Sequence, residues 1–197
     1  MARGKPIPAL MQPIQTPRFE LRPASRFQMF RMYRRAMADP ELRGSLLLEV
    51  REPGLRKAWK RMKGTNGRTR FCHAIIDKAS GEAVGYHYIK ILNYRTAAPE
   101  VMIFDKNWWG KGAVIEIRKA LYVALYDHAS IEQITAQVHS RNFASILNHR
   151  KMGMEQSGTI YLAKYDEVRD EPADFVLLSL RGEKLREKIE EWRHERG

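Results

Sequence analysis

A short loop with two glycines and a lysine offers the clearest chemistry in this sequence. Gly110, Lys111 and Gly112 lie between a predicted strand and a predicted helix. Glycines let the backbone approach a ligand closely, and the N–H groups of a helix N-terminus favour phosphate. Two glycines also serve as ordinary turn chemistry. The loop lacks the third glycine of a dinucleotide fingerprint and the Gly-Lys-Ser/Thr ending of a Walker loop, so both of those nucleotide-binding folds are disfavoured.

The segments around this loop alternate between strand and helix patterns. Short runs with period-two or continuous apolar character predict strands, and apolar residues at helical spacing predict helices. In chain order the patterns predict a strand over 19–22, helices over 26–37 and 53–62, strands over 71–77, 83–92 and 99–104, a helix over 113–128, a strand over 131–138, a helix over 142–151, and strands over 154–164 and 174–180. The mixture of local hairpins and crossover helices predicts a single mixed α/β sheet with helices on both faces.

Three parts are expected along the chain. Residues 1–17 contain four prolines and predict an arm without regular elements. Residues 18–181 form the main domain, and residues 182–197 a charged C-terminal helix whose apolar face packs on the domain or mediates dimerisation. The chain is therefore expected to be a monomer or a homodimer.

Two motifs in the main domain, taken together, resemble those of a known family. The stretch over 99–116 runs from a strand into Trp109, the glycine-lysine-glycine loop and a helix with Glu116. About 30 residues later, Asn142 and Ser145 stand in an Asn-x-x-Ser pattern that leads to Lys-x-Gly around Gly153. This pairing resembles the GNAT superfamily of N-acetyltransferases, nearest its RimJ/RimL-like branch, over roughly residues 18–181. Two departures are Met154, where the family has an aromatic residue, and Asn107, where many relatives have Arg or Gln.

The resemblance implies a twisted, mostly antiparallel sheet with a splayed central strand pair, and acetyl-CoA as the acyl donor. The family's pantetheine arm pairs with the open edge of the third strand of the meander, and a backbone N–H there polarises the thioester carbonyl. Carried over by motif, the cofactor-binding residues are Met102, Ile103 and Phe104 for pantetheine, Trp109, Gly110, Lys111, Gly112 and Ala113 for the diphosphate, and Asn142.

Three side chains are candidates for proton transfer by the same resemblance. Ser145 falls where the RimL-like branch places a hydroxyl near the coenzyme sulfur. His149 takes the position of a tyrosine that acts as general acid in many GNAT enzymes, and histidine titrates near neutral pH. Glu100 opens the strand that faces the acceptor, where a carboxylate receives the amine proton directly or through water. Each also has a structural interpretation, as a helix serine, a packed histidine or a surface carboxylate, and Glu116 is expected to favour its helix dipole.

Charge is distributed very unevenly along the chain. The net charge is +12, and residues 1–70 hold 17 Lys and Arg against 5 Asp and Glu. In the family's architecture, the helices in this region form a wall of the acceptor site. A cationic polyamine or aminoglycoside would be repelled there, whereas a polyanion would be attracted. The residues expected to contact the acceptor or polyanion are Arg31, Arg34, Arg35, Lys57, Lys60 and Arg61, with Arg26 beside them.

The acceptor itself stays open between several alternatives. One is an N-terminus or lysine of a ribosome-associated protein, and another is an amino-modified base in DNA or RNA. A free small amine, with the basic region serving only solubility, is a third. A catalytically silent nucleic-acid-binding module with the same fold is the competing hypothesis from another class.

Other sequence features place the chain in a broad class. No apolar stretch is long enough to span a membrane and no secretory signal is present at the N-terminus, so a cytoplasmic protein without membrane contact is expected. Cys72 is the one cysteine, which excludes an internal disulfide and a cysteine-based metal cluster. No metal site is expected.

Overall fold

The computed structural model describes residues 5–92 and 95–195 of the chain. The elements follow in the order η1 (Pro8–Met11), β1 (Ile14–Gln15), β2 (Phe19–Pro23), α1 (Arg26–Ala38), α2 (Pro40–Leu47), α3 (Leu55–Arg61), β3 (Arg70–Asp77), β4 (Ala83–Ile91), β5 (Thr96–Ile103), η2 (Lys106–Trp108), α4 (Ala113–Ala129), β6 (Gln133–His139), α5 (Phe143–Lys151), β7 (Glu155–Asp166), β8 (Glu171–Arg181) and α6 (Gly182–His194), where η marks a 3₁₀ helix. Every predicted helix and strand occurs close to its expected bounds. The additional elements are η1, β1, α2 and η2.

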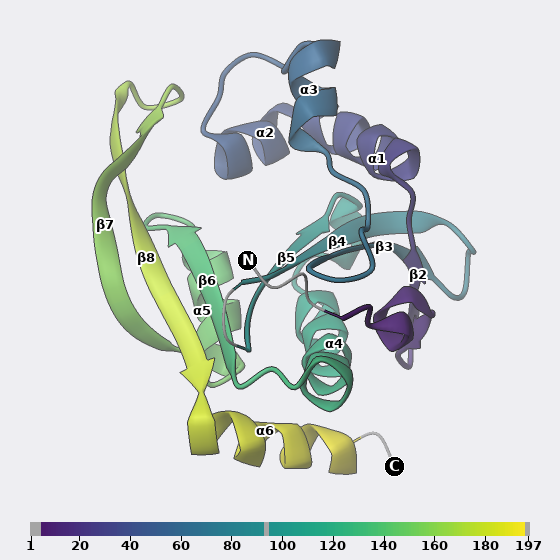
Figure 1. Ribbon diagram of the computed structural model, residues 1–197. Helices are drawn as coiled ribbons and strands as arrows, with labels where there is room; N and C mark the ends of the chain where they lie inside the picture. The colour runs from purple at the N-terminus through teal and green to yellow at the C-terminus, as the bar shows by residue number, and fades with distance from the viewer. Residues whose placement is uncertain (1–4, 93–94, 196–197) are drawn as a thin grey trace.

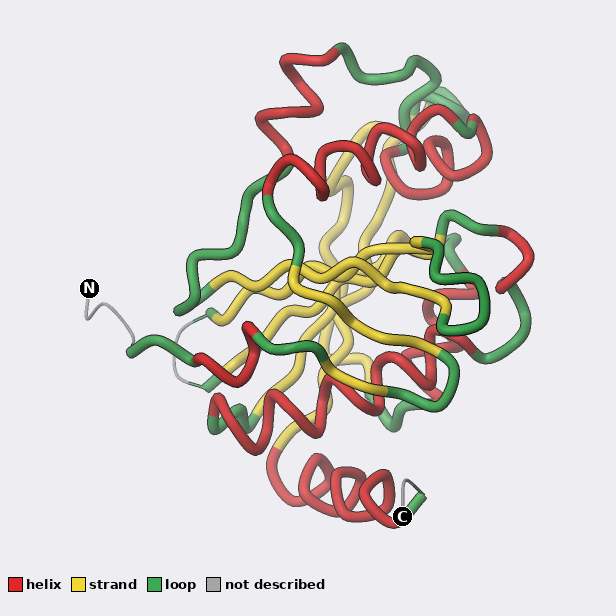
Figure 2. Tube along the Cα trace, turned by 90° about the vertical axis from the view of Figure 1, so that its right-hand side faces the viewer, coloured by secondary structure: helices red, strands yellow, loops and turns green. Residues whose placement is uncertain are grey.

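One eight-stranded sheet runs through the molecule in the order β1-β2-β3-β4-β5-β6-β8-β7. All neighbours pair antiparallel except β5 and β6, which are parallel. Helices α1, α2 and α3 lie on one side of it, while α4 and α6 lie on the other (Figures 1 and 2). The predicted mixed, mostly antiparallel sheet with helices on both faces is confirmed.

The alternation of side chains along β5 divides the interior into two cores. Val101 and Ile103 pack into the larger core under α4 and α6. Met102, together with Phe104 just after the strand, packs into a smaller core under α1, α2 and α3. Successive side chains of a strand point to opposite faces. Residue 100 therefore lies on the face of α1–α3.

The first residues of the chain are packed into the fold rather than forming a free arm. Leu10 is 1% exposed in the larger core, and its carbonyl oxygen is 3.0 Å from Nε2 of His73. Proline fixes φ and removes a backbone donor, so the elements formed between the prolines are short. Strand β1 pairs with β2 at Ile14–Leu21. The expectation of an arm thus missed two short elements, and its first four residues lie outside the described part of the chain.

Local capping explains the helices of the basic region. Ser25 and Gln28 form a capping box at the start of α1. Asp39 accepts hydrogen bonds from the N–H groups of Glu41 and Leu42, and Pro40 takes the first helical position of α2. The Asp-Pro pair was therefore a sequence signal for α2 that the periodicity alone did not reveal.

Helix α6 packs on its own domain. Its apolar residues Leu185, Ile189 and Trp192 all belong to the larger core, and the ring of Trp192 lies 6.0 Å from that of Tyr122 on α4. The predicted continuation of this helix to residue 196 lies outside the described residues. Within the described ranges, no helix combines the length and the apolar character needed to cross a bilayer.

Candidate active site

The glycine-lysine-glycine loop has the backbone geometry of an anion-binding turn. Gly110 has φ 72° and Gly112 has φ 74°, both in the left-handed region that favours glycine. The first N–H groups of a helix have no partner within it, and helix α4, which starts at Ala113, has no side-chain cap to accept from them either. Lys111 is exposed beside them. The loop thus presents backbone donors, a helix dipole and a cation to one region.

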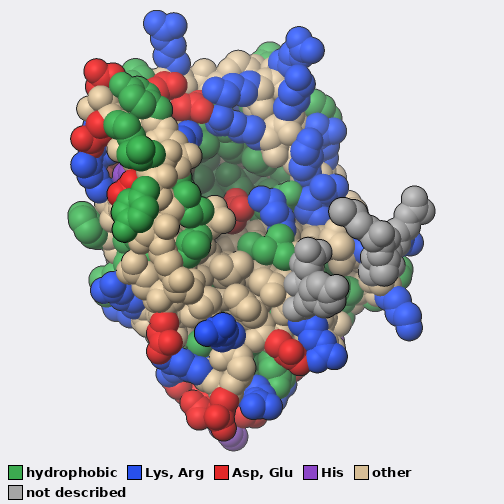
Figure 3. Space-filling model, turned by 60° about the vertical axis from the view of Figure 1, so that its left-hand side comes forward, with side chains coloured by type: hydrophobic (Ala, Val, Ile, Leu, Met, Phe, Trp, Pro, Cys, Tyr) green, Lys and Arg blue, Asp and Glu red, His purple; other side chains and the backbone are tan. Residues whose placement is uncertain are grey.

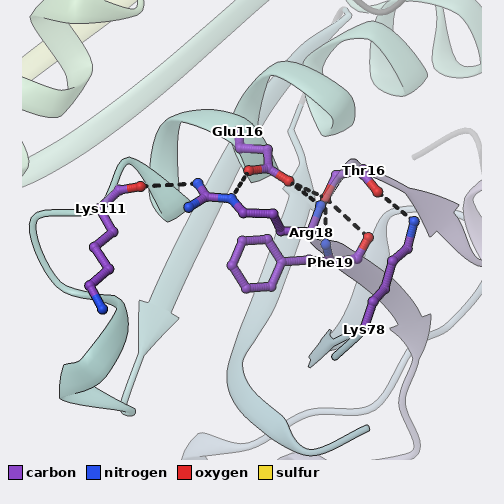
Figure 4. A network of polar contacts seen from close by, with 6 residues as sticks. All are labelled: Thr16, Arg18, Phe19, Lys78, Lys111 and Glu116. Atoms are coloured by element: carbon purple, nitrogen blue, oxygen red, sulfur yellow. Dashed lines mark hydrogen bonds and ion pairs between the residues drawn. The ribbon is translucent and has the colours of Figure 1, made fainter. Parts of the chain in front are cut away.

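A polar network fixes this loop to the N-terminal segment (Figure 4). Glu116 accepts hydrogen bonds from the Thr16 hydroxyl at 2.6 Å, the Arg18 backbone N–H at 2.8 Å and Arg18 Nε at 2.6 Å. A second guanidinium nitrogen of Arg18 donates to the Lys111 carbonyl oxygen at 3.0 Å. Burial alone raises the pKa of Glu116, but the hydrogen bonds from Thr16 and Arg18 outweigh it and lower the pKa. Glu116 is therefore a structural anchor, as its position in the first helical turn predicted.

Replacing Glu116 by glutamine is expected to cost about 2 kcal/mol of unfolding free energy at pH 7, because charge-assisted hydrogen bonds are lost. The folded-state pKa is lowered below the ordinary value of 4.5, so the carboxylate stabilises the fold above that pH. This contribution disappears as the pH falls through the folded pKa. Denaturant unfolding at pH 7 and pH 3 measures it, with exposed Glu187→Gln on α6 as control. Equal stability of E116Q and the parent at pH 7 would contradict the anchoring role.

Strands β5 and β6 separate soon after they meet. They pair only at Thr96–Gln133 and Ala97–Ile134, although β5 continues to Ile103 and β6 to His139. Beyond these two pairs, the edge of β5 that faces β6 is not covered by a strand. The segment from Met102 to Phe104, which the sequence assigned to pantetheine, lies at the end of this open edge. The predicted splayed strand pair is present.

Helix α5 follows β6 and begins with the second predicted motif. Asn142 is its N-cap, and the side-chain oxygen accepts a hydrogen bond from the Ser145 N–H at 3.0 Å. Using its oxygen as the cap leaves the side-chain amide N–H groups of Asn142 as donors. Ser145 lies in the first turn of the helix and is half-buried.

His149, one turn after Ser145, is enclosed. It is 3% exposed, and its Nε2 lies 3.1 Å from an Nη of Arg118, which must donate to it. The proton is therefore assigned to Nδ1, which lies 2.9 Å from the sulfur of Met154. Burial, followed by the charge of Arg118, lowers the pKa of His149 to about 3. Such a group is neutral at pH 7, so this environment favours a packing role over the expected general acid.

Glu100 lies on the face of the sheet that carries α1, α2 and α3. It is exposed on β5, opposite Tyr88, and its Oε1 lies 3.3 Å from Nζ of Lys90. Its neighbour Met102 on the same face belongs to the smaller core. The register that the sequence left uncertain therefore directs Glu100 to the face that carries α1, α2 and α3.

A broad hollow opens between α3 and the long β7–β8 hairpin. Figure 3 shows apolar side chains in its depth and Lys and Arg along its upper rim. A cavity of about 700 Å³ lies against α3 and is lined by Gly54, Leu55, Arg56, Lys57, Lys60 and Arg61. Lys164 on β7 is in electrostatic contact with Glu49, Arg61 and Lys57 across the hollow; burial, the largest cause, lowers its pKa.

The tip of the hairpin reaches the segment after α2. The N–H of Glu167 donates to the Leu48 carbonyl oxygen at 2.9 Å, and the N–H of Val50 donates to Oε2 of Glu167 at 3.1 Å. Lys164 also donates to the carbonyl oxygen of Leu47. These bonds join the last two strands to the helical region across the hollow.

Several of the predicted polyanion-binding cations have internal partners. Arg61 and Lys57 donate to Glu49 at 2.6 and 3.2 Å, and these bonds keep the pKa of Glu49 low although burial opposes it. Arg34 pairs with Glu52 at 2.8 Å, and Arg35 lies over the ring of Phe104 at 4.8 Å.

Of the other predicted cations, one joins two helices and two are exposed. Arg26 bonds to carbonyl oxygens at the end of α3 and covers the Trp59 ring at 4.1 Å, so it joins the two helices. Arg31 and Lys60 are exposed and have no ion pair within residues 5–92 and 95–195. Arg56, which also lines the cavity, was not among the sequence-predicted site residues.

Comparison with known proteins decides the family. A family model described as an acetyltransferase (GNAT) domain matches residues 18–155. The chain belongs to the GNAT acetyltransferase family. No curated protein sequence matches it.

Solved GNAT structures share the fold at low sequence identity. A GNAT-family acetyltransferase from Bacillus anthracis is 16% identical with a TM-score of 0.68, covering 86% of this chain and 98% of that one. A GCN5-related N-acetyltransferase from Brucella melitensis is 14% identical with a TM-score of 0.72, covering 93% and 85%. Spermidine N-acetyltransferase from Vibrio cholerae, in complex with CoA and spermine, is 14% identical with a TM-score of 0.70, covering 85% and 98%.

This GNAT acetyltransferase uses acetyl-CoA as its acyl donor. The thioester supplies an activated acetyl group, and the protein must orient it, polarise its carbonyl and exclude water. The uncapped start of α4, the left-handed glycines and the open edge of β5 fit a diphosphate followed by an extended amide-containing arm. Sequence reasoning missed Arg118, because a single arginine among the apolar positions of α4 gives no signal that it is buried.

Proposed function

We propose that this acetyltransferase modifies a primary amine carried on, or docked beside, a polyanion. The observation that carries the proposal is the basic rim of the hollow on the acceptor side. Arg56 and Lys60 are exposed and line the cavity at α3, and Arg31 is exposed on the neighbouring helix α1. An exposed cluster of one sign attracts phosphates over a distance of about 10 Å at 0.1 M salt.

On the donor side, we assign the diphosphate of acetyl-CoA to the loop from Trp109 to Ala113. The Trp109 indole donates to the Ile103 carbonyl oxygen at 3.1 Å, which ties the loop to the end of β5. The backbone of residues 102–104 then binds the pantetheine arm along the open edge, and the amide of Asn142 donates to it from α5. These groups orient the thioester between the two strands.

For the chemical step, we assign Ser145 and Glu100 to the two sides of the sheet. The Ser145 hydroxyl lies on α5 on the donor side and solvates the departing sulfur. Glu100 faces the acceptor side and receives the proton lost by the amine, directly or through water. A neutral amine is the nucleophile, because an ammonium has no lone pair to donate.

The charge of the acceptor side argues against a cationic acceptor such as a polyamine. Glu49 is only 7% exposed and already engaged by Arg61 and Lys57, and Glu52 pairs with Arg34. A polycation would therefore meet Arg31, Arg56 and Lys60, which have no ion pair in the described residues, while Glu100 is already paired with Lys90. An N-terminus or lysine of a ribosome-associated protein, in keeping with the RimJ/RimL-like motifs, and an amino-modified nucleobase both fit this charge.

Acetyl transfer to amines on ribosomal particles or nucleic acid is expected to fall at least about tenfold between 50 and 200 mM salt, because phosphate contacts release counterions. An Arg56→Gln/Lys60→Gln variant is expected to lose most of this salt dependence and most of the rate at low salt. Arg186→Gln on α6, on the other face of the sheet, is the matched control. Acetyl transfer from radiolabelled acetyl-CoA to a panel of free and polyanion-borne amines measures both effects.

Two outcomes of this assay favour other functions. Turnover of free small amines that does not change with salt would identify a small-amine acetyltransferase whose basic helices serve solubility. Salt-dependent binding of nucleic acid without acetyl transfer, and without a rise of melting temperature on addition of acetyl-CoA, would identify a silent binding module.

A further inference from the structure

Arg118 on α4 is a buried cation without a counter-ion. It is 5% exposed, and no carboxylate pairs with it in the described parts of the chain. Burial lowers its pKa, yet a guanidinium stays protonated in proteins. An isolated buried charge is strongly unfavourable unless something compensates it.

The neighbours of Arg118 do not supply a negative charge. His149 accepts one hydrogen bond from it, and its pKa of about 3 keeps it neutral. His87 is completely buried with a pKa lowered well below its ordinary value, and burial raises the pKa of Tyr122. All three groups, which come from α5, β4 and α4, are therefore uncharged at pH 7.

Arg118 also keeps unused donors. Its Nε and Nη1 have no hydrogen-bond partner, and neither do the Tyr122 hydroxyl or the two ring nitrogens of His87. Buried polar groups in native proteins nearly always have partners, and a group without one calls for an explanation. The cluster carries one positive charge and several free donors.

The cluster lies on the α4 face of the sheet, between β4 and α5. His87, an electrostatic neighbour of Arg118, stands directly opposite Val101 in the β4–β5 pairing. On the other side, Arg118 bonds to His149 on α5, one turn beyond Ser145. Arg118 thus has neighbours on β4, which pairs with β5, and on α5, the helix assigned to the coenzyme sulfur.

We propose that Arg118 supplies the positive charge that stabilises the coenzyme A thiolate during acetyl transfer. When the acceptor nitrogen bonds to the acetyl carbon, the carbon–sulfur bond breaks and its electron pair is left on sulfur. The amine loses one proton to Glu100 or water, so a negative sulfur and a permanent buried cation face each other through a medium of low dielectric constant. A fixed charge of this kind needs no reorganisation during the reaction.

This inference rests on the donor placement given above, and it makes a prediction about binding that does not depend on turnover. A nearby cation lowers the pKa of the bound thiol, because it favours the thiolate. Above that lowered pKa, coenzyme A binds more tightly than desulfo-coenzyme A, which has no thiol. One unit of pKa shift corresponds to about a tenfold gain in relative affinity.

Calorimetric titration with coenzyme A and desulfo-coenzyme A from pH 6.5 to 9.5 tests the inference. In the parent protein the affinity ratio is expected to rise about tenfold or more with pH. In Arg118→Met, of similar volume but uncharged, the rise is expected to be less than about threefold. Arg150→Met, an exposed cation on α5, is the matched control and is expected to behave like the parent.

The possible failures are distinguishable. Binding of neither ligand by the folded parent protein would overturn the donor placement itself. Binding of both ligands with a constant affinity ratio in the parent, or the same pH-dependent rise in Arg118→Met as in the parent, would overturn the role of Arg118 alone. If Arg118→Met is unfolded, Arg118→Gln takes its place as the uncharged variant: loss of the rise supports the role, and the same rise as in the parent refutes it.

Discussion

Substitution of Gly110 by valine is expected to reduce coenzyme A affinity by about a hundredfold or more, close to 2.7 kcal/mol of binding free energy. At φ 72°, a β-branched side chain is strained, and relief of that strain redirects the N–H groups of the loop. An added Cβ meets no protein atom within 4 Å, so the rest of the fold does not clash with the new side chain and the loss falls on the ligand assigned to this loop. Titration calorimetry with coenzyme A measures the loss.

Gly81 provides a matched control for this experiment. It has φ 73° in the turn between β3 and β4, and an added Cβ there also meets nothing within 4 Å. Gly81→Val should therefore lower stability as much as Gly110→Val, by about 1–2 kcal/mol, and leave coenzyme binding unchanged. Equal coenzyme affinity of the two variants would show that the diphosphate binds elsewhere.

The second large effect is a loss of stability in acid. Burial lowers the pKa of His73 to about 4, against a backbone hydrogen bond to Leu10 that opposes it, and that of His149 to about 3. In the unfolded chain both titrate near 6.5, so below this pH the unfolded state binds protons that the folded state does not. Stability is present above pH 6.5 and falls as the pH falls towards the folded values. Between pH 7 and 5 the two groups are expected to remove about 4 kcal/mol of unfolding free energy.

His87 permits a sharp test of this acid sensitivity. Both of its ring nitrogens lack partners, so His87→Leu removes an unsatisfied buried group and a site that the unfolded chain protonates. We expect this variant to be more stable than the parent at pH 5 and to show a shallower decline with pH. Exposed His128→Gln should keep the parent's profile. Urea unfolding from pH 5 to 8 measures the slopes, and a slope for His87→Leu equal to that of the parent would refute a contribution of His87 to the acid sensitivity.

Local patterns carried most of the fold. The apolar runs of β3 and β4, the short hairpin between them and the helical spacing of α4 are properties of neighbouring residues, and the structure confirms all of them. The splayed pair of β5 and β6 followed from the resemblance rather than from any residue in them. Helix α2 went unpredicted because its apolar pattern is short, although Asp39 and Pro40 marked its start.

Long-range pairing is what the sequence could not reveal. Glu49 binds Arg61 and Lys57, which removes two cations from the expected acceptor surface, and nothing in the local pattern of those residues announces it. Arg118 occupies an interior position of an otherwise apolar helix face. Such contacts depend on how distant segments pack, and their sequence signal is no different from that of a solvated charge.

The bonds between the hairpin tip and the segment after α2 have a consequence for how reactants meet. Strands β5 and β6 are joined at Thr96 and Ala97, and the far end of the same opening is bridged through Glu167 to Leu48 and Val50. The space between the two strands is thus bounded by the strand pairing at one end and by these hydrogen bonds at the other. A long polymer cannot slide sideways into such an aperture. Under the proposed function, an acceptor would therefore present its amine end-on, as a chain terminus or the tip of a projecting side chain, while the rest of the molecule stays on the basic rim outside.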